Sequence, residues 1–244
     1  MAIKSNKKVL ALSSSRVGSS GFLEEALSPI NNFLGKTALR IAFIPFASVQ
    51  KDDDEYGSMV TEALQSLPHF VEIVTAKNAK PTIEAADAIM TGGGNTFKLL
   101  HDIYKLDLKE IIQHKVNSGT PYIGWSAGSN ITGLSISTSN DMPIIEPQSF
   151  KALSFFPFQI NPHYFNQPIQ GHNGETRDQR LSEFIVLNPG IPVVGLPEGT
   201  GLLLENNKLT LTGRHNAVLF INKNAEVQRR EISAADDLGF LLEN

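Results

Sequence analysis

Residues 121–128 read Pro121-Tyr122-Ile123-Gly124-Trp125-Ser126-Ala127-Gly128, and the interpretation of the whole chain starts from this stretch. Its second half is a G-x-S-x-G pentapeptide that follows a short β-prone segment. In such a run the serine lies on a tight turn between a strand and a helix, and its hydroxyl faces a cleft. Glycines fit there because a side chain would crowd so sharp a turn. Small residues also form ordinary turns, so the surrounding sequence must decide whether Ser126 is a nucleophile.

Apolar and amphipathic segments alternate around this stretch. Short, nearly continuous apolar runs predict buried parallel strands at residues 8–12, 40–46, 71–75, 88–91 and 122–125. Helical spacing of apolar residues predicts helices at 21–34, 54–67, 96–104, 108–116 and 176–187. Strand-like runs follow from residue 191, with hairpin turns at 206–207 and 222–224. The pattern predicts a three-layer α/β/α sandwich with a mostly parallel, doubly wound sheet and late antiparallel strands.

The composition limits the classes of function. A chain of 244 residues, 41% hydrophobic and without a linker or low-complexity tract, is expected to form one domain over residues 1–244. The net charge of −4 and the scattered basic residues argue against a nucleic-acid partner. No apolar run is long enough to cross a membrane. The absence of cysteine excludes disulfides, thiolate metal sites and a cysteine nucleophile, and it suits a cytoplasmic protein.

A serine nucleophile needs a base, and His163 is the best candidate among six histidines. It follows a β-like stretch, and Asn161-Pro162 before it favours an extended or turn backbone that can direct the side chain into a cleft. The other histidines fall in turns, loops or helix surfaces: His69, His101, His114, His172 and His215.

The sequence offers two carboxylates that could orient His163, and it does not separate them. Asp141 lies on a loop between the serine and the histidine, which gives the order Ser–Asp–His known from hydrolases. Glu198 comes just after an apolar strand, where sites of α/β proteins usually gather. One of the two could orient the base while the other binds substrate.

Two further features fit an acyl-transfer site. The run Gly92-Gly93-Gly94-Asn95 separates a strand from a helix, so the N–H groups of Gly94 and Ala127 could bind an oxyanion. The run lacks the spacing of a dinucleotide or phosphate loop, and a simple helix-start turn remains an alternative. Arg177 begins a helix after His163; it could bind a substrate carboxylate in bidentate fashion, or it could be a surface charge.

Five segments together resemble the peptidase E family, the α-aspartyl dipeptidases. These segments occur in order between about Lys8 and the Leu196-Pro197-Glu198-Gly199 run, and the resemblance is looser after residue 200. They are residues 92–97, 122–128, 138–144, 156–163 and 171–177.

The resemblance implies a serine dipeptidase without metal or cofactor that cleaves dipeptides beginning with aspartate. It implies a flavodoxin-like fold, similar to the class I glutamine amidotransferase domain, with serine in place of cysteine. By resemblance, Ser126 is the nucleophile and His163 the base, with Asp141 as the acid of the charge relay and Glu198 as its rival. Further roles carried over are the oxyanion donors Gly94 and Ala127, and the aspartyl ligands Asn95 and Arg177.

Other interpretations stay open at this point. A relative acting on longer aspartyl polymers, such as a cyanophycinase-like peptidase, would need a wider cleft. A catalytically silent module that binds an acidic small molecule would have no need of both Ser126 and His163. The expected partners are small dipeptides, and the sequence leaves a homodimer open.

Overall fold

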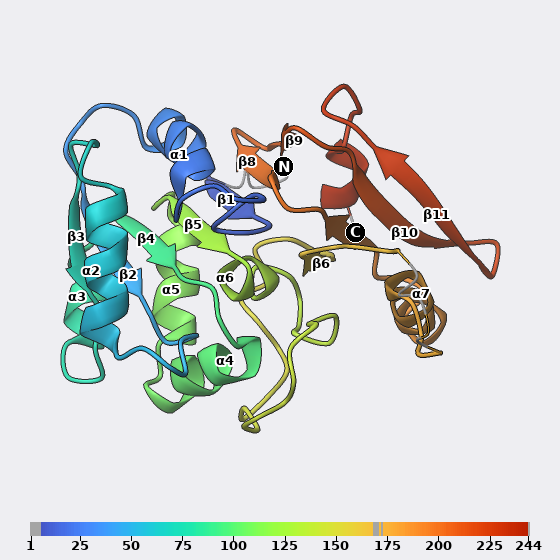
Figure 1. The fold of residues 1–244 in the computed structure, drawn as a ribbon, viewed down its shortest axis with the longest axis horizontal. Helices are drawn as coiled ribbons and strands as arrows, with labels where there is room; N and C mark the ends of the chain where they lie inside the picture. The colour runs from blue at the N-terminus through green and yellow to red at the C-terminus, as the bar shows by residue number, and fades with distance from the viewer. Residues whose placement is uncertain (1–5, 168–170, 172, 244) are drawn as a thin grey trace.

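A seven-stranded, mostly parallel sheet forms the centre of the larger part of the molecule (Figure 1). The computed structural model describes residues 6–167, 171 and 173–243. The strand order is β3-β2-β4-β5-β1-β8-β9, with all pairs parallel from β3 to β1 and antiparallel from β1 to β9. The bounds are β1 Val9–Leu12, β2 Arg40–Ile44, β3 Phe70–Ile73, β4 Ala88–Thr91, β5 Tyr122–Trp125, β8 Thr200–Glu205 and β9 Lys208–Gly213.

Helices cover both faces of this sheet, as the apolar runs predict. Alternate residues of β1 belong to different cores: Leu10 and Leu12 share a cluster with α1 and α2, whereas Val9 and Ala11 share one with α3, α4 and α5. The sheet is therefore the middle layer of a three-layer α/β/α sandwich. The helices are α1 Leu27–Leu34, α2 Asp53–Ala63, α3 Ala79–Ala85, α4 Thr96–Lys105 and α5 Lys109–Asn117, and a short 3-10 helix, η1 Glu24–Ala26, precedes α1.

The late strands are divided between two sheets. β8 and β9 extend the large sheet beyond β1. The other late strands belong to a second, four-stranded sheet of order β11-β10-β7-β6. Its bounds are β6 Gln159–Pro162, β7 Val193–Leu196, β10 Ala217–Lys223 and β11 Glu226–Ile232. α7, Arg177–Leu187, lies against β10 and β11, and its Leu181 and Ile185 pack with Tyr164 and Phe220. In Figure 1 this layer lies at the opposite end of the molecule from α2 and β3.

Several bounds differ from the sequence prediction. The first predicted helix begins late, because Leu23 adopts φ 57° and residues 24–26 form a 3-10 turn before α1. The second hairpin turns at Asn224-Ala225, so its turn ends one residue beyond the predicted range 222–224. Elements without a sequence prediction are α3, β11 and the 3-10 helix η2 Gly239–Leu242, while the helix expected after Ser126 is the four-residue α6 Ala127–Asn130. Within the described residues, no helix has the length and apolarity needed to cross a bilayer.

Candidate active site

The site lies at the carboxyl ends of neighbouring strands. β4 and β5 pair in parallel with Thr91 opposite Gly124, so the segments that follow them start side by side. The Gly92–Asn95 run follows β4, and Ser126 follows β5. In open α/β sheets, ligands bind at this edge.

Ser126 occupies a strained turn between β5 and α6. Its backbone has φ 53° and ψ −115°, a combination that a residue with a side chain rarely adopts. The turn is tight enough that a Cβ on Gly124 would clash with the Gly128 carbonyl oxygen, and α6 lies so close to the end of β4 that a Cβ on Gly128 would clash with the Thr91 carbonyl oxygen. The G-x-S-x-G run therefore forms the strand–turn–helix that its sequence predicts.

His163 links Ser126 to a carboxylate. Its Nε2 lies 3.0 Å from Ser126 Oγ, and its Nδ1 lies 2.8 Å from Glu198 Oε1. Because an ionised carboxylate can only accept, the Nδ1–H donates to Glu198 and Nε2 is left to accept from the serine hydroxyl. The side chains of His163 and Glu198 are 41% and 50% exposed, so solvent reaches this pair. Ser126, His163 and Glu198 form a continuous hydrogen-bonded chain.

Asp141 is engaged elsewhere. Its Oδ2 accepts from the Thr96 backbone N–H at 2.7 Å and from Ser139 Oγ at 3.2 Å. Among the described residues, the carboxylate that contacts the His163 ring is Glu198. Of the two carboxylates that the sequence left open, Glu198 contacts the His163 ring, whereas Asp141 hydrogen-bonds to Thr96 and Ser139.

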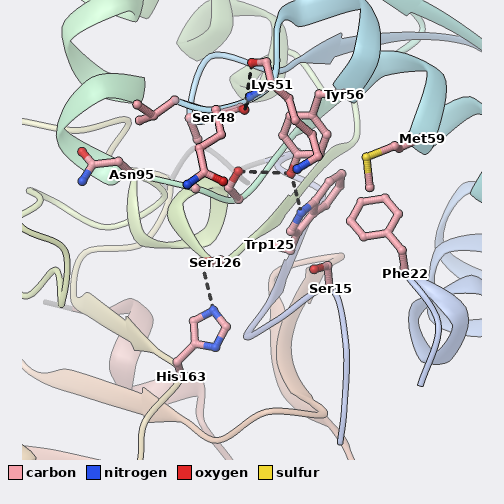
Figure 2. Close-up of a pocket in the computed structure, with 15 residues that line it drawn as sticks. Ser15, Phe22, Ser48, Lys51, Tyr56, Met59, Asn95, Trp125, Ser126 and His163 are labelled. Atoms are coloured by element: carbon pink, nitrogen blue, oxygen red, sulfur yellow. Dashed lines mark hydrogen bonds between the residues drawn. The ribbon is translucent and has the colours of Figure 1, made fainter. Parts of the chain in front are cut away.

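Two cavities meet at Ser126 and His163. The Arg177 cavity, of about 300 Å³, is polar and is lined by Arg177, Asp141, Asn130 and Asn140 among others. The Trp125 cavity, of about 440 Å³, has an aromatic and aliphatic wall of Phe22, Tyr56, Met59 and Trp125 (Figure 2). Ser126 and His163 line both, so the hydroxyl lies between two chemically different compartments.

Comparison with known proteins identifies the family of this chain. The model of peptidase family S51 matches residues 9–212. A peptidase E of Nostoc sp. is 47% identical over 98% of this chain and 98% of its own length. A peptidase E of Haemophilus influenzae is 48% identical over 90% of this chain and 94% of its own. The chain belongs to peptidase family S51.

Solved structures share the fold of this S51 peptidase. The crystal structure of a putative peptidase E from Listeria monocytogenes EGD-e superposes with a TM-score of 0.65 at 22% identity, over 86% of this chain and 99% of that one. A peptidase from an acI-B1 actinobacterium gives a TM-score of 0.64 at 14% identity, over 95% and 96% of the two chains. The sequence prediction of family and fold class is confirmed, and the chain is a peptidase and hence a hydrolase.

The Gly92–Asn95 run is held against the β2 edge of the site. Gly94 has φ 140°, and a Cβ there would lie 2.2 Å from the Ala47 carbonyl oxygen, so the position requires glycine. The Gly94 N–H has no acceptor among the described residues. Ala127 is the first residue of α6, and its N–H therefore has no acceptor within the helix. Both predicted oxyanion donors are thus free to bind a ligand.

Asn95 is already hydrogen-bonded at both ends of its amide. Its Oδ1 accepts from the Lys98 N–H at 3.0 Å and caps α4, while its Nδ2 donates to the Met142 carbonyl at 2.9 Å. The residue lines the Trp125 cavity rather than the Arg177 cavity. The contacts of Asn95 are those of a residue that fixes the loop beside Asp141.

Arg177 is half-buried in the polar cavity and has no ion-pair partner among the described residues. Burial lowers the pKa of its guanidinium, Arg180 lowers it further, and Asp141 raises it. Arginine still keeps its charge in proteins, so the cavity presents a partly desolvated cation. A capping box between Thr176 and Gln179 fixes the first turn of α7, where Arg177 lies.

Sequence reasoning missed two residues that position the site. Tyr56 donates its hydroxyl to the Gly93 carbonyl at 3.1 Å and accepts from Trp125 Nε1 at 3.2 Å, so it joins the glycine run to the turn that carries Ser126. Burial raises the pKa of Tyr56 to about 12, which keeps the hydroxyl a donor. Ser13 Oγ accepts from the His163 N–H at 2.9 Å and donates to the Leu196 carbonyl at 2.8 Å. The Ser13-Ser14-Ser15 run after the first strand was the available signal for Ser13.

No group of three or more histidine, aspartate or glutamate side chains that could hold a metal occurs among residues 6–167, 171 and 173–243. His172, which belongs to one of the family segments, lies outside the described residues.

Proposed function

We propose that this S51 peptidase is a serine dipeptidase that hydrolyses dipeptides with an N-terminal aspartate through an acyl-enzyme on Ser126. The observation that carries the proposal is the chain Ser126–His163–Glu198, which opens beside a cavity containing the half-buried Arg177. The 47% identity to a peptidase E over nearly the whole chain supports the same substrate class.

In the proposed reaction His163 removes the Ser126 proton as the hydroxyl oxygen attacks the peptide carbonyl. The imidazolium that forms is stabilised by Glu198 and then donates the proton to the leaving amine. Water hydrolyses the aspartyl ester by the reverse route. This assignment makes Glu198 the orienting acid, a role that the family resemblance gave to Asp141 with Glu198 as its rival.

The developing oxyanion is assigned to the N–H groups of Gly94 and Ala127, which lie on the two segments that flank Ser126. Removing one donor from such a site typically costs about 2.7–4 kcal/mol of transition-state stabilisation. Neither group is a side chain, so the proposal rests on their free N–H groups and on the strained turn that holds Ala127 beside the nucleophile.

The Arg177 cavity is assigned to the aspartyl residue. Arg177 would bind the β-carboxylate in bidentate fashion, and the Asp141 carboxylate is available for the free α-ammonium group. A substrate without the carboxylate would leave a half-buried guanidinium unpaired, and kcat/KM for such a substrate would therefore be much lower. The role of Asn95 as an aspartyl ligand stays a prediction. To bind the substrate, its amide would have to give up its hydrogen bond to the Lys98 N–H or to the Met142 carbonyl.

A substrate panel tests the proposal. We expect the wild type to cleave Asp-Leu, to cleave Glu-Leu and Asn-Leu far less, to spare N-acetyl-Asp-Leu and to ignore chelators, while Ser126→Ala abolishes turnover. Activity that survives Ser126→Ala overturns the nucleophile, and equal cleavage of Asn-Leu overturns carboxylate recognition. Binding of Asp-Leu without any hydrolysis would instead identify a silent binding module.

A matched pair of arginine variants tests the specificity cation. Arg177→Met should lower kcat/KM for Asp-Leu by about 10- to 150-fold, the range for losing a charge-assisted hydrogen-bonded contact. Arg180→Met is the control because Arg180 lies on the same helix, is 58% exposed and pairs with Glu175 at 3.6 Å. A loss of the same size in both variants would show that α7 as a whole, and not Arg177, governs recognition.

A further inference from the structure

We infer that the Trp125 cavity binds the amino acid released from the dipeptide and that Lys51 binds its terminal α-carboxylate. The inference rests on the proposed function, because it takes the Arg177 cavity as the site of the aspartyl residue. It assigns a ligand to the second compartment and names the residue that would restrict the enzyme to dipeptides.

The position of Ser126 dictates which compartment receives the leaving residue. The carbonyl under attack must lie at the serine hydroxyl, where the two cavities meet. With the acyl group in the Arg177 cavity, the bond that breaks points into the Trp125 cavity. His163, which must protonate the departing amine, lines both compartments and is within reach of that nitrogen.

The lining of the Trp125 cavity suits the side chain of an amino acid of moderate size. Phe22 lies edge-on to Trp125 with ring centroids 6.3 Å apart, and Tyr56 and Met59 complete an apolar wall on the same side of Ser126 (Figure 2). This wall can bury an aliphatic or aromatic side chain. No aspartate or glutamate occurs among the described residues that line the cavity.

Lys51 is the only lysine or arginine among those same lining residues. It is half-buried and forms no ion pair with any described carboxylate. Its backbone is fixed by Ser48, whose Oγ accepts from the Lys51 N–H at 3.0 Å and donates to its carbonyl at 2.9 Å. The adjacent Asp52 is occupied as the cap of α2, since it accepts from the Glu55 N–H at 2.8 Å. Lys51 thus places a cation without an ion-pair partner on the wall of a cavity whose described lining residues include no acidic side chain.

The partner that completes this arrangement is the carboxylate of a free C-terminus. In a dipeptide that group lies one residue beyond the scissile bond, on the side of the Trp125 cavity. An amidated or extended substrate presents no charge there, and it leaves the Lys51 ammonium without a partner. Lys51 would therefore favour dipeptides over longer chains.

The test compares two substrates that differ only in this charge. For Lys51→Met, KM for Asp-Leu should rise about 10-fold, the effect expected for a charge-assisted contact at a partly buried site, while KM for Asp-Leu-amide changes less than about twofold. Lys51→Arg should restore the preference for the free acid. Lys77→Met is the control, because Lys77 is an exposed lysine that lines none of the described cavities.

Binding measurements separate this inference from the proposed function. In the Ser126→Ala background, calorimetry should show that Lys51→Met weakens binding of Asp-Leu about 10-fold and leaves binding of the amide unchanged. Equal effects on both ligands, or none on either, overturn the role of Lys51 even if hydrolysis of Asp-Leu is confirmed. Failure of the wild type to hydrolyse Asp-Leu overturns the proposed function, whereas a charge-specific loss of binding would still support Lys51.

Discussion

Glu198→Gln should impair catalysis far more than Asp141→Asn. The Glu198 carboxylate lies 2.8 Å from His163 Nδ1, and during acylation the imidazole gains a positive charge. At that distance a full charge pair in water is worth about 1.5 kcal/mol by Coulomb's law, and partial burial raises this value. Because both side chains are about half exposed, at 41% and 50%, the high-dielectric end of the range applies.

Loss of the hydrogen bond adds to the loss of charge. A glutamine can turn its NH₂ group towards Nδ1, which stabilises the tautomer that carries a proton on Nε2 and blocks proton transfer from Ser126. The expected cost is about 1.5–3 kcal/mol of transition-state stabilisation, which is roughly a 10- to 150-fold decrease in kcat. KM for Asp-Leu should change little, because Glu198 lines neither of the two cavities at Ser126.

Steady-state kinetics on Asp-Leu with three variants decides the matter. Asp141→Asn keeps an oxygen for the Thr96 N–H but removes a charge from the Arg177 cavity, so it should raise KM more than it lowers kcat. Glu205→Gln is the control, because Glu205 is partly buried and pairs with Lys8 at 3.1 Å, outside both cavities. The reasoning fails if Asp141→Asn lowers kcat more than Glu198→Gln, or if Glu198→Gln stays within twofold of the wild type.

Two further predictions concern the support of the site. Tyr56→Phe should lower kcat and destabilise the protein by about 1–3 kcal/mol, because buried Trp125 Nε1 loses its acceptor and the Gly93 carbonyl loses its donor. A lowered melting temperature with an unchanged kcat would show that Tyr56 contributes to stability and not to catalysis. In calorimetry, the melting temperature of Ser126→Gly should be about 2–4 °C above that of Ser126→Ala. The reason is that glycine adopts the positive φ of this turn with about 1 kcal/mol less conformational strain than alanine. Equal melting temperatures would show that the turn is not strained.

The large sheet was predictable because its central strands β1, β4 and β5 are buried on both faces and read as continuous apolar runs. β11 escaped prediction for the opposite reason, since Glu226–Ile232 is mostly polar and exposed, as befits an edge strand. α3 carries Pro81 in its first turn and has only seven residues, so no long helical pattern marks it. The division of the late strands between two sheets depends on which strands pair, and apolar runs do not encode their partners.

The contact between His163 and Glu198 depends on strand register. β6 and β7 pair in parallel with Pro162 opposite Leu196, so His163 and Glu198 follow adjacent strand ends and their side chains can meet. Asp141 lies in the irregular segment between α6 and β6, whose path no periodicity reveals. The sequence identified the candidate residues of the site. Which carboxylate meets His163 depends on the parallel pairing of β6 with β7, two strands more than thirty residues apart in the chain.

The two residues proposed to react belong to different sheets. Ser126 follows β5 of the large sheet and His163 follows β6 of the small one, and both adopt positive φ, 53° and 52°. Their 3.0 Å contact therefore depends on how the sheets are joined. Ser13 makes that connection: its backbone N–H donates to the Thr200 carbonyl at 2.8 Å, and its hydroxyl bridges the His163 N–H and the Leu196 carbonyl. Ser126 and His163 each have a positive φ, and each is held by a different sheet, so a shift of one sheet relative to the other would change the distance between the hydroxyl and the imidazole. The strain at the site is thus maintained by the packing of two sheets rather than by the pentapeptide alone.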